Sequence, residues 1–140
     1  MSKRILLADD DRSVRDSLKK VLKEAGYDVL CAADGEDAER KFTSEPIDLL
    51  LLDLDMPGQN GWNVFGLINS QNPLLPIVII SGLKNQTDSE LIPGVSAFLE
   101  KPIEVPVLLK MIEDLLEEPV ETRLQKITCH LQRSQPVPLF

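Results

Sequence analysis

The stretch LLLLDLDMPGQNGW, residues 49–62, decides the fold class because a run of leucines leads directly into two aspartates and a proline-glycine turn. A strand that is apolar at every position is buried on both faces, as in the middle of a parallel sheet. This strand ends at Asp53, and Asp55 comes two positions later. Like charges this close repel each other, so the pair indicates either an acidic turn or a site that handles phosphate or metal.

Short apolar runs and helical patterns alternate along the rest of the chain. The runs that predict strands are residues 4–9, 27–32, 47–53, 75–82 and 96–102. The patterns that predict helices are residues 11–26, 34–45, 62–71, 85–92 and 104–118. The helix at 85–92 is the weakest of these, because Pro93 and Gly94 leave it little room. Five strand-helix units predict a doubly wound α/β fold, a parallel sheet with helices on both faces.

The composition restricts the class of protein. A chain of 140 residues is long enough for one domain with its own core, and an aromatic share of 4% predicts that this core is aliphatic. The net charge of −8 argues against direct binding of nucleic acid. No segment approaches the roughly 18 apolar residues of a membrane span, and the first residues do not resemble a signal peptide. We therefore expect a cytoplasmic protein without membrane contact.

The cysteines and the end of the chain carry weaker signals. Cys31 and Cys129 are expected to be reduced, and Cys129 with His130 lacks the second ligand pair of a zinc site. Residues 1–118 are predicted to form the domain. Residues 119–140 begin and end with proline-containing segments, and their weak apolar periodicity predicts a helical extension or a linker.

Polar residues follow four of the predicted strands. They are Asp9, Asp10 and Asp11, then Asp53, then Ser81 and Gly82, and finally Lys101 and Pro102. In the common strand order 2-1-3-4-5, the first and third strands are neighbours, so their carboxylates meet at one edge. Clustered carboxylates predict a bound divalent cation, and oxygen ligands suit Mg²⁺ or Mn²⁺. Asp11 alone is also a good N-cap for the first helix.

Four of these motifs, ILLADDD, LLLLDLDMPGQNG, IVIISG and AFLEKP, resemble the receiver domain of two-component response regulators over about residues 3–118. The resemblance implies a flavodoxin-like five-stranded parallel sheet of order 2-1-3-4-5. It also implies a phosphoprotein that transmits a signal in a phosphorelay. Such a domain is not an enzyme in the usual sense, since it catalyses only its own phosphorylation and dephosphorylation.

The resemblance implies a role for each residue of the acidic edge. Asp53 would be the phosphoacceptor, whose carboxylate attacks the phosphorus of a phosphohistidine and forms an acyl phosphate. Asp10 and Asp53 would bind Mg²⁺ directly. Asp9 would hold the ion through water, and Asp55 would offer its main-chain carbonyl.

The remaining motifs supply the response to the phosphoryl group. Lys101 would pair with Asp53 and later with the phosphoryl oxygens, and Ser81 would donate its hydroxyl to one of those oxygens. Phe98 matches the aromatic switch residue of the family. Gly82 would leave the approach to Asp53 open, and Pro102 would follow a cis peptide bond.

The implied partners are a sensor histidine kinase or a phosphotransfer protein, an output domain or downstream protein, and a second copy in a homodimer.

Two other functions remain open. LLLLDLD also fits the opening motif of haloacid-dehalogenase-like phosphatases, although Pro57 and Gly58 depart from their pattern. The second alternative function is that of a receiver-like binding module that is never phosphorylated. Because residues 119–140 are too few for a DNA-binding domain, we expect a stand-alone receiver or a receiver cut from a longer chain.

Overall fold

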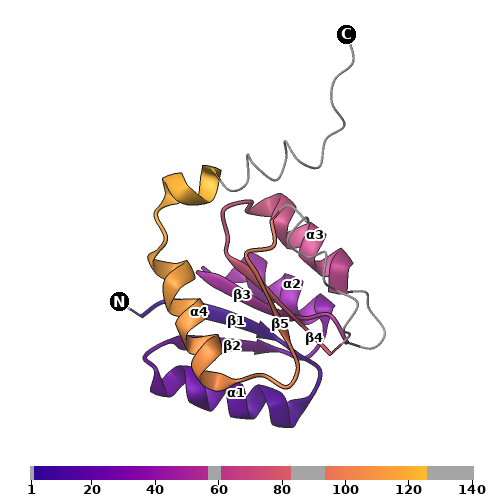
Figure 1. The fold of residues 1–140 in the computed structure, drawn as a ribbon. Coiled ribbons are helices and arrows are strands. Elements are labelled where there is room, and N and C mark those ends of the chain that lie inside the picture. The colour runs from indigo at the N-terminus through magenta and orange to yellow at the C-terminus, as the bar shows by residue number, and fades with distance from the viewer. Residues whose placement is uncertain (1, 57–60, 83–93, 126–140) are drawn as a thin grey trace.

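The computed structural model describes residues 2–56, 61–82 and 94–125. A five-stranded parallel sheet lies between two layers of helices (Figure 1). The strands are β1 (Arg4–Ala8), β2 (Asp28–Ala32), β3 (Leu49–Asp53), β4 (Ile77–Ser81) and β5 (Ala97–Glu100). The helices are α1 (Arg12–Glu24), α2 (Gly35–Ser44), α3 (Gly61–Gln71) and α4 (Val105–Glu117).

The order of the strands is β2-β1-β3-β4-β5, and every neighbouring pair is parallel, as predicted. β1 lies against β3, with Ala8 beside Leu52 in the register. On the other side of β3, Asp53 is the register partner of Ile80 in β4. The carboxyl ends of β1, β3 and β4 therefore lie side by side at one edge of the sheet.

Alternating residues of the buried strands face opposite layers of helices. In β3, Leu49 and Leu51 belong to a core cluster with residues of α1 and α4, whereas Leu50 and Leu52 pack toward α2 and α3. All four of these leucines are completely buried. Burial of a leucine side chain contributes about 1.5–3 kcal/mol to the stability of the fold, so the predicted aliphatic core holds both helical layers against the sheet.

Local signals set the limits of α1. The Asp11 carboxylate accepts hydrogen bonds from the N–H groups of Ser13 and Val14, so Asp11 is the predicted N-cap. At the other end the helix stops before Gly26, whose φ of 98° is the left-handed conformation that favours glycine. This arrangement fixes the loop that carries Asp9 and Asp10.

The third predicted helix forms, and the structure resolves which of its residues face the core. Val64, Phe65 and Ile68 of α3 are buried, while Leu67 is 43% exposed, so Ile68 is the inward residue. Trp62 contacts Phe65 edge to face, with ring centroids 5.7 Å apart. The helix predicted over residues 85–92 lies outside the described residues.

Beyond α4, residues 120–125 are helical, and residues 126–140 lie outside the described part of the chain. Arg123 connects this short helix to the domain through hydrogen bonds. Its guanidinium donates hydrogen bonds to the carbonyls of Leu74 (2.9 Å), Leu115 (3.0 Å) and Glu118 (3.2 Å). The first part of the extension is therefore packed against the end of the domain.

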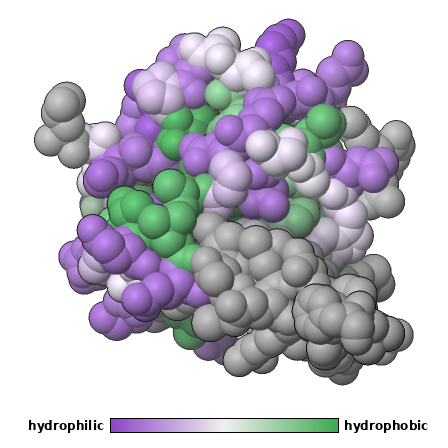
Figure 2. Space-filling view, turned by 90° about the horizontal axis from the view of Figure 1, so that it is seen from above, coloured by the Kyte–Doolittle hydropathy of each residue, from purple (hydrophilic) through white to green (hydrophobic). Residues whose placement is uncertain are grey.

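Figure 2 shows one face of the molecule, on which hydrophobic residues form small areas separated by hydrophilic ones. Among the described residues, the most exposed large apolar side chains are Leu67, Val107, Val120 and Leu124. None of the described helices combines the length and apolar character that crossing a bilayer requires.

Candidate functional site

Three carboxylates converge where β1 and β3 end. Asp9 and Asp53 are both 1% exposed, whereas Asp10 lies at the surface. One carboxylate oxygen from each of the three residues lies within 4.8 Å of the other two. The structure thus brings together the acidic residues that the sequence predicts at this edge, with two of them buried and one open to solvent.

The carboxylate of Asp9 is buried, and only one of its two oxygens accepts a hydrogen bond within the described part of the chain. Its Oδ1 accepts the N–H of Asp11 at 2.9 Å, but its Oδ2 is buried without a hydrogen-bond partner among the described residues. Burial raises the pKa of Asp9 to about 6. The negative charge of Asp53 also raises it, whereas the hydrogen bond from the Asp11 N–H lowers it. A buried carboxylate oxygen with no donor is suited to a cation.

The donor set fits a hard divalent ion. Carboxylate oxygens are the ligands that Mg²⁺ and Mn²⁺ prefer, and Mg²⁺ sites in proteins use few carboxylates and keep several waters. The exposed position of Asp10 leaves one side of the cluster open to such waters. The orphaned Oδ2 of Asp9 is the observation that favours a cation over a purely structural cluster.

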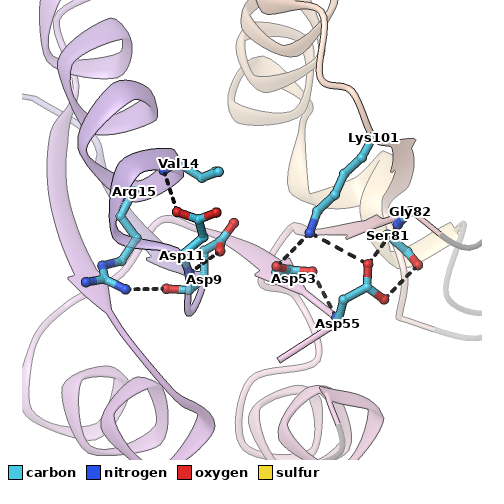
Figure 3. Close-up of polar contacts among 9 residues, drawn as sticks. All are labelled: Asp9, Asp11, Val14, Arg15, Asp53, Asp55, Ser81, Gly82 and Lys101. Carbon is cyan, nitrogen blue, oxygen red and sulfur yellow. Dashed lines mark hydrogen bonds and ion pairs between the residues drawn. The ribbon is translucent and has the colours of Figure 1, made fainter. Parts of the chain in front are cut away.

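Lys101 reaches toward Asp53 from a direction different from that of Asp9 (Figure 3). Its Nζ is 3.0 Å from Asp53 Oδ2 and 3.6 Å from Asp55 Oδ2. Partial burial works against the charged ammonium, but the hydrogen bond and charge of Asp53 outweigh it and raise the pKa of Lys101. Lys101 therefore remains a cation at neutral pH. The peptide bond from Lys101 to Pro102 is cis, as the resemblance implies.

The Asp55 side chain makes contacts that sequence reasoning missed. Its Oδ1 accepts the Ser81 hydroxyl at 3.2 Å, and its Oδ2 accepts the Gly82 N–H at 2.8 Å (Figure 3). Its main-chain N–H donates to Asp53 Oδ1 at 2.9 Å. The sequence predicted none of these side-chain contacts, and the metal-ligand role that the resemblance implies for Asp55 concerns its main-chain carbonyl. The sequence did contain a signal for these contacts. Asp55 follows the third predicted strand, Ser81 and Gly82 end the fourth, and the order 2-1-3-4-5 makes these two strands neighbours.

Phe98 occupies the place in β5 that the sequence indicates. It is half-buried, lies beside Ile79 of β4 in the register and packs against the core cluster on the side of α2 and α3. Lys101 comes three positions later, so the strand that carries Phe98 also leads to the cation of the site.

Comparisons with known proteins agree with this geometry. Residues 5–113 match the family model described as the response regulator receiver domain. Response regulator RR06 of Streptococcus pneumoniae is 34% identical over 114 residues, which are 80% of this chain and 52% of that protein. Response regulator MprA of Mycobacterium ulcerans is 38% identical over 120 residues, which are 83% of this chain and 51% of that protein. This chain spans about half the length of these two relatives.

Solved structures show the same fold. A CheY-like receiver domain protein from Methanospirillum hungatei superimposes with a TM-score of 0.80 at 30% identity, over 87% of this chain and 98% of that one. The response regulator TrrA of Thermotoga maritima, crystallised with Mg²⁺ and BeF, gives a TM-score of 0.75 at 31% identity, over 81% and 98% of the two chains. Together with the match of the family model and the order of the five strands, these likenesses show that the chain belongs to the receiver domain family of response regulators.

Proposed function

We propose that this receiver domain accepts one phosphoryl group on Asp53. The observation that carries the proposal is the position of Asp53, a buried carboxylate at the end of β3 with the Lys101 ammonium 3.0 Å from its Oδ2. On its other side lie Asp9 and Asp10. A carboxylate that lies between the Lys101 ammonium and a site for a metal cation is suited to receive a group that brings additional negative charge.

The donor would be a phosphohistidine of a sensor histidine kinase or a phosphotransfer protein. A carboxylate oxygen of Asp53 forms a bond to phosphorus as the bond from phosphorus to the imidazole nitrogen breaks. The imidazole leaves with the electron pair of that bond and returns to its neutral form with a proton, and Asp53 becomes an acyl phosphate. In this proposal the protein promotes only its own phosphorylation and the later hydrolysis of the acyl phosphate.

Three carboxylates of this chain would hold the metal. Asp10 and Asp53 would contact Mg²⁺ or Mn²⁺ directly, Asp9 would do so through water, and the main-chain carbonyl of Asp55 would be a further ligand. When bound there, the ion offsets the negative charge of the phosphoryl oxygens. The unpartnered Oδ2 of Asp9 supports this assignment, because a buried acceptor without a donor is stabilised by a nearby cation.

After transfer, the residues around Asp53 would respond to the new charge. Lys101 is 34% exposed, and its flexible side chain can move from the carboxylate to the phosphoryl oxygens. The Ser81 hydroxyl would turn toward the same group. The vacated space would let Phe98 move inward, which gives a two-state switch biased by one phosphoryl group.

The switch would be read by an output domain or a downstream protein, or through a homodimer. The matched regions make up only 52% and 51% of the two relatives named above, which supports an output domain in those proteins. We assign residues 1–118 to the receiver domain and residues 119–140 to an extension. The contacts of Arg123 support a structured start for that extension.

The test is incubation with acetyl phosphate and Mg²⁺ followed by intact-mass measurement. We expect the wild type to gain one phosphoryl group and Asp53→Asn to gain none. Asp48→Asn is the matched control, because Asp48 precedes the other end of β3 and accepts the Arg4 N–H at 2.8 Å, far from the site. Absence of an adduct on wild type and Asp48→Asn alike would support a binding module that is never phosphorylated.

A further inference from the structure

The Asp55 carboxylate contacts three donors at the edge of the sheet where Asp53 lies, and one of them, Lys101, also contacts Asp53. They are the Ser81 hydroxyl, the Gly82 N–H and the Lys101 ammonium. Two of the three, Ser81 and Lys101, are the groups to which the proposed function assigns the phosphoryl oxygens. One set of donors thus has two prospective acceptors, the carboxylate of Asp55 and the phosphoryl group on Asp53.

We propose that the Asp55 carboxylate occupies the phosphoryl-binding position in the unphosphorylated protein. It would have to release Ser81, Gly82 and Lys101 before Asp53 can hold a phosphoryl group, so Asp55 sets the resistance of the site to phosphorylation. This inference rests on the proposed function. It concerns the side chain of Asp55 and is independent of the main-chain carbonyl assigned to the metal.

The distances around Lys101 support a position that the Asp55 carboxylate and a phosphoryl group on Asp53 would share. A single ammonium lies 3.0 Å from Asp53 Oδ2 and 3.6 Å from Asp55 Oδ2, so the two carboxylates meet at Lys101. A Cβ built on Gly82 would lie 3.6 Å from Asp55 Oδ2 and 3.9 Å from Lys101 Cδ. These are ordinary van der Waals distances, so Gly82 lies directly beside the Asp55 carboxylate and the stem of Lys101.

Electrostatic repulsion explains why a phosphoryl group on Asp53 would displace the Asp55 carboxylate. A carboxylate and a phosphoryl group carry like charges and accept the same kind of hydrogen bond, so they cannot share these donors without mutual repulsion. The Asp55 side chain is 29% exposed, so it can turn toward water once it loses its donors. Phosphorylation would then exchange one anion for another at Ser81, Gly82 and Lys101, and Asp55 would move outward.

Affinity for beryllofluoride, a phosphoryl mimic, tests the competition without any transfer step. It is measured by calorimetry at saturating Mg²⁺ on the wild type, Asp55→Asn and Asp55→Ala. We expect about tenfold tighter binding in Asp55→Ala, because the donors no longer have to leave a carboxylate. Asp55→Asn should fall between the two, since an amide oxygen still accepts hydrogen bonds but carries no charge.

Removal of a negative charge could strengthen anion binding at a distance, so a charge control is needed. Glu100→Gln removes an exposed carboxylate from the residue next to Lys101. We expect this variant to change the affinity by less than about twofold, because exposed charges are screened by solvent and salt. An effect equal to that of Asp55→Ala would overturn the inference.

A double-mutant cycle with Ser81→Ala separates competition from loss of structure. In the wild-type background, Ser81→Ala removes a donor from both the free and the bound state, so beryllofluoride affinity should change little. In the Asp55→Ala background the free state no longer contains the hydrogen bond from Ser81 to Asp55, so the same substitution should weaken binding more strongly, by about tenfold. Equal effects of Ser81→Ala in both backgrounds would contradict the inference.

The outcomes also separate this inference from the proposed function. Absence of beryllofluoride binding in every variant would overturn the proposed function and the inference with it. Binding that is equally tight in the wild type and Asp55→Ala would overturn only the inference. Tighter binding in Asp55→Ala together with the coupling to Ser81 would support both.

Discussion

The Nζ atom of Lys101 lies 3.0 Å from Asp53 Oδ2, although the two residues are 48 positions apart in the chain. Asp53 is buried and Lys101 is partly exposed, so the cation reaches into the site from the rim. This contact joins the end of β3 to the residue that follows β5 and places an ammonium beside the buried carboxylate. It is also the contact that a phosphoryl group on Asp53 would change.

Lys101→Met keeps much of the side-chain volume and removes the charge. A hydrogen bond to a charged group contributes about 1.5–3 kcal/mol, so we expect beryllofluoride affinity to fall by roughly 10- to 100-fold. Titration calorimetry at fixed Mg²⁺ measures the change. Lys101→Arg keeps the charge with a different shape and should retain part of the affinity. Unchanged affinity in Lys101→Met would show that the cation does not contact the phosphoryl position.

The raised pKa of Asp9 makes the metal-free fold sensitive to pH. An unfolded aspartate has a pKa near 3.9, and Asp9 in the fold has a pKa of about 6. Between these values the native state keeps a proton that the unfolded chain has released, so the contribution of Asp9 to stability is greatest below about pH 4 and is lost as the pH rises to about 6. The free energy of unfolding of Asp9→Asn should lack this fall.

Urea denaturation with a chelator present, from pH 4 to 7, measures this difference. The unfolding free energy of Asp9→Asn minus that of the wild type should increase across the range by on the order of 3 kcal/mol. Comparison of the two proteins cancels the other titrating groups. A difference that stays constant with pH would show that Asp9 is not held in a raised-pKa environment.

Divalent cations should stabilise the protein through the acidic cluster. A ligand present at 100 times its Kd adds about 2.7 kcal/mol to stability, so Mg²⁺ should raise the Tm of the wild type measurably. Asp10→Asn should reduce the shift. Asp11→Ala is the control, since Asp11 caps α1 and its loss costs about 1 kcal/mol without removing a ligand. Equal shifts in Asp10→Asn and wild type would place the ion elsewhere.

Arg123 should hold residues 118–125 against the domain. Its donors serve three carbonyl groups, so Arg123→Ala should lower stability by about 1–2 kcal/mol and speed amide hydrogen exchange in this segment. Arg12→Ala is the matched control, because Arg12 is exposed and its ion pair with Asp16, at 3.8 Å, is long. Unchanged exchange in Arg123→Ala would mean that other contacts anchor the extension.

Much of the fold could be predicted because its signals are local. The apolar run at residues 49–52 specifies a buried strand wherever it lies, and Asp11 and Gly26 mark the ends of α1 through their own chemistry. The meeting of Asp9 with Asp53 followed from the order of the strands, a general rule for α/β sheets. These predictions did not depend on the position of any individual side chain.

The rest depends on side-chain directions that no sequence pattern contains. Leu67 and Ile68 are equally apolar, and only the rotation of α3 against the sheet decides which is buried. The Asp55 carboxylate turns toward Ser81 because the carboxyl ends of β3 and β4 lie side by side. Arg123 donates to the carbonyl of Leu74, which is 49 positions away in the sequence and close only after folding.

The central claim is that Asp53, and not its neighbour Asp55, carries the phosphoryl group. Borohydride reduces an aspartyl phosphate to homoserine, so it marks the residue that formed the acyl phosphate. After incubation with acetyl phosphate and Mg²⁺, the protein is reduced, digested and sequenced by fragmentation mass spectrometry. We predict homoserine at position 53 and unmodified aspartate at position 55. Homoserine at position 55, or at any other aspartate with position 53 unchanged, would contradict the account.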